Sequence, residues 1–286
     1  MFRRQTSGSV VCPSCGSLVG VNDERCFRCG RWNPALGGFA PLLRRLGNDL
    51  GFVSIVIGGC TILYILSLLV TIAFAGPEAI GATGLLSILA PGQGALLLLG
   101  ESGAVPVFYY GRWWTILSAG WLHGNFLHIL FNMLWVRQLA PVVADMYGVG
   151  RMIIIYTIAG IAGFLLSSTT GAFGFSLPFF HGAGYTVGAS ASIMGLLGAL
   201  VHYGRRISTA VYSQALTYAV ILFVFGLAMP GVDNFAHAGG FAGGYLASVW
   251  LNPLKPERQE HMIGALICLG AVFASVLVSV LTVVLR

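Results

Sequence analysis

Three apolar segments of the sequence carry polar residues suited to acyl transfer. His128 and Asn132 lie four residues apart in the first segment, and so share one helix face. Ser190 opens the second segment, and His237 lies near the start of the third. An ionisable group at the centre of a membrane span costs about 2.5–3.5 kcal/mol, so its presence there indicates a function.

The chemistry of these side chains predicts a role for each. Ser190 would attack a carbonyl carbon, and His237 would take its proton and return it to the leaving amine. His128, Asn132 and the backbone N–H of Ser190 would hold the oxyanion, where a single donor is worth about 2.7–4 kcal/mol. Asp233 is the acidic residue nearest this depth, and its position predicts a helix N-cap. We therefore expect a Ser–His dyad and not a triad.

The composition places these segments in a membrane protein. Of the 286 residues, 57% are hydrophobic and 8% are charged, whereas an ordinary soluble domain has about 25% charged residues. Spans need roughly 20 apolar residues, and seven segments are long enough: 52–75, 122–142, 152–170, 188–204, 211–229, 233–251 and 262–285. The expected fold class is an all-α polytopic membrane protein.

The positive charges predict how the spans are oriented. With the N-terminus in the cytoplasm, all but two of the 15 basic residues, Arg112 and Arg286, lie on the inner side. Because these charges cluster between apolar segments, the net charge of +6 does not indicate a nucleic-acid partner. We expect a multi-pass protein of a bacterial plasma membrane with its C-terminus outside.

In this orientation the three polar sets lie at a similar depth below the outer surface. His128 and His237 lie about 6–10 Å inside their spans, at 1.5 Å per residue. Small residues repeat every four positions beside His237 and would let its helix approach the one carrying Ser190: Ala236, Gly240 and Gly244. A long, weakly charged outer loop, 76–121, is expected to lie half-sunk in the membrane interface.

Four cysteines near the N-terminus have the spacing of a metal site. Cys12 and Cys15 form one Cys-x-x-Cys pair, Cys26 and Cys29 form another, and a glycine follows each pair. Four thiolates in this pattern favour structural zinc, with rubredoxin-type iron as the alternative. Cytoplasmic placement favours a metal over disulfides. The unit would bind a partner, brace the membrane boundary or serve as a structural knot only.

These strings resemble the rhomboid family of intramembrane serine proteases. The resemblance covers about residues 52–251 and rests on three motifs in the family's order: His123, His128 and Asn132; Gly188 and Ser190; and Ala236, His237, Gly240 and Gly244. It implies a six-helix bundle in which Ser190 is the nucleophile, His237 the base, and His128 and Asn132 the oxyanion residues. It also implies transmembrane protein substrates cut near a membrane boundary.

The resemblance also sets the expected domain organisation. Residues 1–36 form a zinc-ribbon-like domain, 37–51 a linker, 52–251 the rhomboid-like core, and 252–286 a cytoplasmic loop and an extra seventh helix. Three positions depart from the family pattern. Ala191 follows the serine where glycine is usual, Met194 replaces an aromatic residue, and Gly111 replaces a tryptophan next to Arg112 in the outer loop.

Two other functions remain open on the sequence. A rhomboid-like protein without activity would bind transmembrane clients, an alternative that Ala191 and Met194 keep open. A transporter or channel would use the buried histidines as a proton relay, and it predicts acidic partners within the spans and repeated halves. His123 could lie at the mouth of the site or at the rim, satisfied by water.

Overall fold

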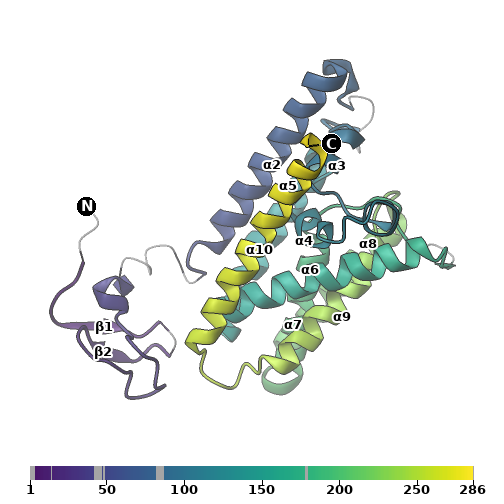
Figure 1. Cartoon of the computed structure of the whole chain (residues 1–286). Coiled ribbons are helices and arrows are strands. Elements are labelled where there is room, and N and C mark those ends of the chain that lie inside the picture. The colour runs from purple at the N-terminus through teal and green to yellow at the C-terminus, as the bar shows by residue number, and fades with distance from the viewer. Residues whose placement is uncertain are drawn as a thin grey trace.

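The computed structural model describes residues 4–13, 15–41, 47, 49–81, 87–177 and 180–285. Arg3, Arg44, Arg45 and Arg286, which the orientation prediction uses, lie outside the described residues, as does part of the predicted linker. Most of the described chain is helical, and the long helices cross one another in a bundle beside a small N-terminal hairpin (Figure 1).

Seven long helices occupy the positions predicted for the spans in the described part of the chain. They are α2 (Phe52–Ala75), α5 (Phe126–Tyr147), α6 (Val149–Ala172), α7 (Ser190–Ile207), α8 (Thr209–Ala228), α9 (Asn234–Trp250) and α10 (Gln259–Val284). Five of them, α2, α5, α6, α8 and α10, are long and apolar enough to cross a membrane. The fold is thus an all-α bundle in which six long helices are followed by α10 as an additional C-terminal helix.

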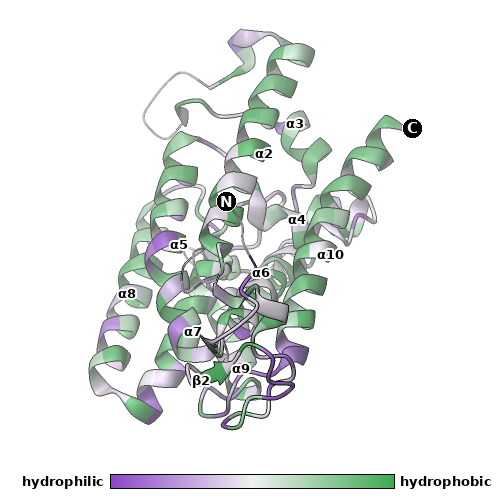
Figure 2. Ribbon diagram, turned by 90° about the vertical axis from the view of Figure 1, so that its left-hand side faces the viewer, coloured by the Kyte–Doolittle hydropathy of each residue, from purple (hydrophilic) through white to green (hydrophobic). Residues whose placement is uncertain are grey.

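The other two helices, α7 and α9, are short and lie inside the bundle. Helix α7 is buried along nearly its whole length, and α9 is rich in glycine and alanine. By contrast, α2, α8 and α10 leave many large apolar side chains exposed, including Phe74, Phe225 and Leu281. Figure 2 shows this hydrophobic colouring along the outer helices. The outer helices therefore provide the surface for lipid, while α7 and α9 can carry polar groups.

Glycine lets α7 and α9 pack with their backbones in contact. A Cβ atom at Gly240 of α9 would overlap the backbone of Ala191 in α7, and one at Gly244 would overlap the backbone of Gly195. On the other side of α9, a Cβ at Gly163 of α6 would overlap the carbonyl of Ala236. This confirms the close packing predicted from the small-residue stripe.

The segment between α2 and α5 has local structure of its own. It contains the helical turns η2 (Pro77–Ala79), α3 (Gln93–Leu99), η4 (Val105–Tyr109), α4 (Thr115–Ser118) and η5 (Ala119–Trp121). Arg112 is buried here, and its guanidinium donates to the Leu97 carbonyl at 2.7 Å. The neighbouring Gly111 has φ +67°, a left-handed conformation that glycine adopts without strain. A turn therefore occupies the position where the family pattern has tryptophan.

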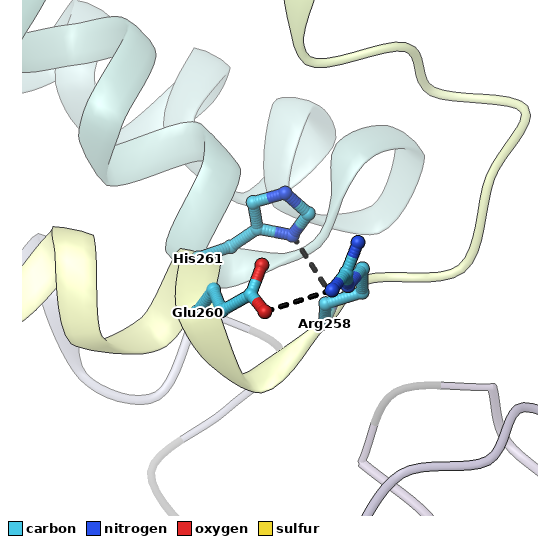
Figure 3. A network of polar contacts seen from close by, with 3 residues as sticks. All are labelled: Arg258, Glu260 and His261. Atoms are coloured by element: carbon cyan, nitrogen blue, oxygen red, sulfur yellow. Dashed lines mark hydrogen bonds and ion pairs between the residues drawn. The ribbon is translucent and has the colours of Figure 1, made fainter.

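A capped loop joins α9 to α10. Arg151 of α6 donates to the carbonyls of Leu251, Asn252 and Lys255 at 2.7–2.9 Å. At the start of α10 the backbone N–H of Arg258 donates to Nδ1 of His261 at 3.0 Å, and Arg258 pairs with Glu260 at 2.7 Å (Figure 3). These contacts fix the position at which α10 begins.

The N-terminal unit is a hairpin with two equivalent turns. Strands β1 (Ser9–Val11) and β2 (Leu18–Gly20) pair antiparallel. The N–H of Gly16 donates to the Cys12 carbonyl at 3.0 Å, and the N–H of Gly30 donates to the Cys26 carbonyl at 2.9 Å. The buried cluster extends through the turn η1 (Leu36–Gly38) to Ala40. Two short strands, β3 (Ser176–Leu177) and β4 (Phe180–His181), form a second hairpin before α7.

Candidate active site

Helix α5 presents His128 and Asn132 from its first two turns. The side chain of Asn125 caps the helix by accepting from the His128 backbone N–H at 2.8 Å. This cap explains why α5 begins at Phe126, four residues after the predicted start, and the helix continues to Tyr147 past Pro141. The Asn132 amide donates to the His128 carbonyl at 2.8 Å, so the two residues lie on one face.

The His128 ring lies against the glycine of the Gly-x-Ser motif. A Cβ atom at Gly188 would overlap the imidazole at Nε2, and the Gly124 N–H lies 3.4 Å from Nδ1. Gly188 has φ +126°, a conformation open to glycine and rare for other residues. Its N–H donates to the Ala119 carbonyl at 2.9 Å. The motif from α7 and the histidine from α5 therefore meet directly.

Ser190 is the first residue of α7 and is partly exposed. The first N–H groups of a helix have no acceptor within it, and the helix dipole adds partial positive charge there. An oxyanion bonded beside Ser190 would therefore meet favourable backbone dipoles. The Ala191 side chain points away toward α6, because its Cβ lies against the space left by Gly163. The methyl group that alanine adds here is therefore accommodated beside Gly163 of α6.

His237 lies in the first turn of α9 and is buried, with a relative exposure of 7%. Its Nδ1 is buried and has no hydrogen-bond partner among the residues that the structure describes. One turn later, Gly240 contacts the backbone of Ala191, the residue after Ser190. His237 also lies close enough to His128 for an electrostatic interaction between the rings. The three polar sets that the sequence predicts to converge therefore come from α5, α7 and α9 into one region.

Asp233 caps α9, as the sequence predicts. Its side chain accepts from the Ala236 N–H at 2.9 Å and from the Ser167 hydroxyl of α6 at 2.5 Å. Ser167 is fully buried and also lies 3.4 Å from the Ala183 N–H, in the loop before α7. Nothing in the sequence pattern distinguishes Ser167 from the neighbouring Ser168 of α6. Its contacts show that it joins three elements around the cap.

His123 is buried and not at the rim. Its ring packs edge-to-face against His128, with centroids 5.1 Å apart, and its relative exposure is 1%. Of the two positions that the sequence left open for His123, this burial excludes the water-exposed rim. His123 therefore lies inside the protein just before α5, with its ring against that of His128.

The four N-terminal cysteines form a second candidate site. All four sulfur atoms lie within 4.8 Å of one another. The Cys12–Cys29 and Cys15–Cys26 sulfur distances are 3.8 and 3.5 Å, whereas a disulfide needs about 2.0 Å. Tetrahedral zinc with bonds of about 2.3 Å sets its sulfur ligands about 3.8 Å apart. The donor set and its spacing therefore suit a tetrahedral metal ion.

Comparison with known proteins identifies the membrane part. The family model described as Rhomboid domain matches residues 110–253, half of the chain. RHOMBOID-like protein 4 of Arabidopsis thaliana is 33% identical over 199 residues, covering 63% of this chain and 48% of the relative. Rhomboid protease GluP of Bacillus subtilis (strain 168) is 34% identical over 165 residues, covering 56% of this chain and 30% of the relative.

The match leaves part of each protein uncovered. This chain aligns with less than half the length of these two relatives, and the family match begins after the four cysteines and α2. Within the matched range lie Ser190, His237, His128 and Asn132. The chain is a multi-pass membrane protein, and it belongs to the rhomboid family.

Proposed function

We propose that this protein is an intramembrane serine endopeptidase that cuts transmembrane proteins with a Ser190–His237 dyad. The observation that carries the proposal is the direct packing of Gly240, one turn after His237, on Ala191, next to Ser190. The relative from Bacillus subtilis is named a protease. Together they support a proteolytic site at this helix contact.

The reaction follows ordinary acyl transfer. The Ser190 oxygen bonds to the substrate carbonyl carbon while its proton passes to His237. The carbon–nitrogen bond then breaks, and the proton moves from His237 to the leaving amine. Water then adds to the acyl carbon while His237 takes its proton; the bond between that carbon and the Ser190 oxygen breaks, and the proton passes from His237 to Ser190, which releases the acid and restores the hydroxyl. His128, Asn132 and the Ser190 N–H would stabilise the oxyanion in both halves.

The substrates we propose are single-span or polytopic membrane proteins, cut near the outer boundary of the bilayer. We propose that the N-terminus is cytoplasmic and the C-terminus outside, in a bacterial plasma membrane. The charge distribution supports this orientation. An enzyme reporter that works only outside the cytoplasm should be active when fused after Arg286 and inactive when fused before residue 4. The opposite pattern would contradict the orientation.

The decisive experiment uses purified protein in lipid and a model single-span substrate. Wild type should cleave it, and Ser190→Ala and His237→Ala should each lower the rate to background. Ser192→Ala is the matched control, a second serine of the same helix that takes no part in the mechanism. Cleavage that survives either active-site change would refute the dyad.

The client-binding alternative is decided by the same assay. On the sequence, Ala191 and Met194 kept that alternative open, and the Ala191 methyl group packs beside Gly163 of α6. Wild type that binds the substrate without cutting any of several sequences would favour client binding. The transporter alternative predicts acidic partners for the histidines within the spans. The ion pair found among the described residues, Arg258–Glu260, lies exposed at the start of α10 and not within a span.

We also propose that Cys12, Cys15, Cys26 and Cys29 bind one zinc ion with a structural role. A unit of this size buries too little apolar surface to fold without support, and a metal supplies the missing free energy. We also propose the domain boundaries predicted from the sequence, after residues 36, 51 and 251. Metal analysis should give one zinc per wild-type chain, and iron in its place would support the rubredoxin alternative.

A further inference from the structure

Helix α10 carries buried hydroxyl groups on one face of an apolar helix. Ser275 and Ser279 lie four residues apart and are 3% and 0% exposed, whereas Leu277 and Leu281 are about half exposed. Residues four apart share a helix face. The face with the serines packs on α3, α4 and α6, while the leucines point outward. Figure 1 shows α10 beside α3 and α4.

Both serines bond to the outer loop. The Ser275 hydroxyl donates to the Trp114 carbonyl at 2.7 Å, and the Trp114 indole N–H donates to the Ser279 hydroxyl at 3.0 Å. The Arg112 guanidinium donates to the Ser279 carbonyl at 3.1 Å. A Cβ at Gly100 would lie against the Ser279 hydroxyl. Two stretches of the loop, around 100 and 112–114, therefore meet at Ser279.

The same loop holds the backbone in front of the candidate nucleophile. Ser118 donates to the Gly100 carbonyl at 2.8 Å, and the next residue, Ala119, accepts from the Gly188 N–H at 2.9 Å. Ser102 and Thr186 exchange two backbone hydrogen bonds, at 2.8 and 3.2 Å. Hydrogen bonds thus run from α10 through the loop to Gly188, two residues before Ser190.

Few other side chains near residue 112 can hold the loop against α10. Gly111 has no side chain, and Trp113 and Tyr109 are 65% and 71% exposed. Arg112 and Trp114 are therefore the side chains of this turn that reach inward, and both bond to α10. A hydroxyl in a membrane helix needs a partner, and here the loop supplies it.

We propose that α10 braces the outer loop, and that Ser275 and Ser279 are positioning residues for the reaction at Ser190. The brace keeps the Ala119 carbonyl in place, and that carbonyl fixes Gly188 against His128. The catalytic half of this inference rests on the proposed function. The brace itself is a statement about the loop and can be tested without any substrate.

The test compares wild type with four variants in lipid nanodiscs. They are Ser275→Ala, Ser279→Ala, the double variant that carries both of these changes, and Trp114→Phe. Amide hydrogen exchange across residues 100–121 should become about 3- to 10-fold faster in the double variant, since buried hydrogen bonds are lost. Ser279→Ala and Trp114→Phe remove the same bond, so their combination should be no worse than either alone. Ser213→Ala is the control, because this exposed hydroxyl donates to the Ala210 carbonyl within its own helix, α8.

Kinetics separate positioning from a general loss of structure. With a model substrate, kcat should fall about 3- to 10-fold while KM changes little, because loss of this bond disturbs the nucleophile and not the substrate contacts. Ser279→Thr restores the hydroxyl and should recover most of kcat.

Unchanged exchange in the double variant would overturn the brace. Faster exchange with unchanged kcat would overturn the positioning role. A wild type that cleaves nothing would instead refute the proposed function, and the brace would then stand or fall on the exchange result alone.

Discussion

Gly188 is the residue on which the candidate site depends most for its backbone shape. It combines φ +126° with direct contact to the His128 ring. A side chain at this position would strain the backbone and displace the imidazole. The conformation therefore explains why the motif needs glycine two residues before the serine.

Replacing Gly188 with alanine should lower kcat at least 10-fold with a smaller loss of thermal stability, because the strain lies beside Ser190. Gly184→Ala is the matched control in the same loop, where a Cβ meets no atom closer than 4.0 Å. Both variants would be assayed for cleavage and thermal unfolding. Equal activity of the two variants would contradict this account.

Glu101 is a buried carboxyl group of the outer loop and should make stability depend on pH. It is 3% exposed and accepts a hydrogen bond from Gln93, and burial raises the pKa of Glu101 from 4.5 to about 8. Because the pKa is higher in the folded state, its stabilising contribution is full below about pH 4.5 and is lost as the pH rises through about 8.

Glu101→Gln should therefore reduce the loss of stability between pH 5 and pH 9, since glutamine keeps an acceptor without the charge. Thermal unfolding of wild type and of the variant, followed at both pH values, measures the effect. The same decline with pH in wild type and variant would show that another group is responsible.

At the scale of elements, α7 and α9 make backbone contact beside Ser190 and His237, the two residues of the proposed dyad. Glycine normally weakens a helix by roughly 0.5–1 kcal/mol relative to alanine, so the repeated glycines of α9 require a gain in stability that offsets this cost. Close approach of the two backbones provides it, because side chains larger than hydrogen would separate Ser190 from His237.

Gly240→Ala should therefore destabilise the protein by about 1–3 kcal/mol and abolish cleavage. Gly270→Ala in α10 is the control, because a Cβ there meets nothing within 4 Å, and it should leave activity unchanged. Reversible unfolding and cleavage of both variants give the comparison. A Gly240→Ala variant as stable and active as wild type would mean that α7 and α9 tolerate a wider separation.

At the scale of the molecule, a small cysteine unit precedes a membrane bundle with its own core. The buried cluster around Val10, Val19 and Ala40 is separate from the cluster formed by the helices. The two parts therefore have separate buried clusters, and under the zinc proposal the cysteine unit would depend on the metal while the bundle depends on helix packing.

Cys12→Ser should remove zinc from the protein and expose residues 5–40 to rapid hydrogen exchange. Protection of α6, α7 and α9 should stay as in wild type, and Ser7→Ala, at an exposed position of the same unit, serves as a control. Full zinc content in Cys12→Ser would remove the metal proposal. Loss of protection in the bundle would show that the two parts fold together.

The sequence by itself determined the class of protein and the approximate positions of the long helices in the described part of the chain. These follow from local rules, because spans need about 20 apolar residues and a polar group within them needs a reason. The small residues at 236, 240 and 244 also predicted which helices touch. The start of α5 was misplaced, since the Asn125 cap decides it and apolar content does not.

Only the tertiary structure decided how the outer loop is held and where His123 and Ser167 lie. Ser275 and Ser279 look like ordinary small residues of a lipid-facing helix until their partners more than 160 positions away are known. Hydrogen bonds of this kind join distant segments and leave no periodic pattern in the sequence. Their geometry exists only once α10 and the loop have packed together.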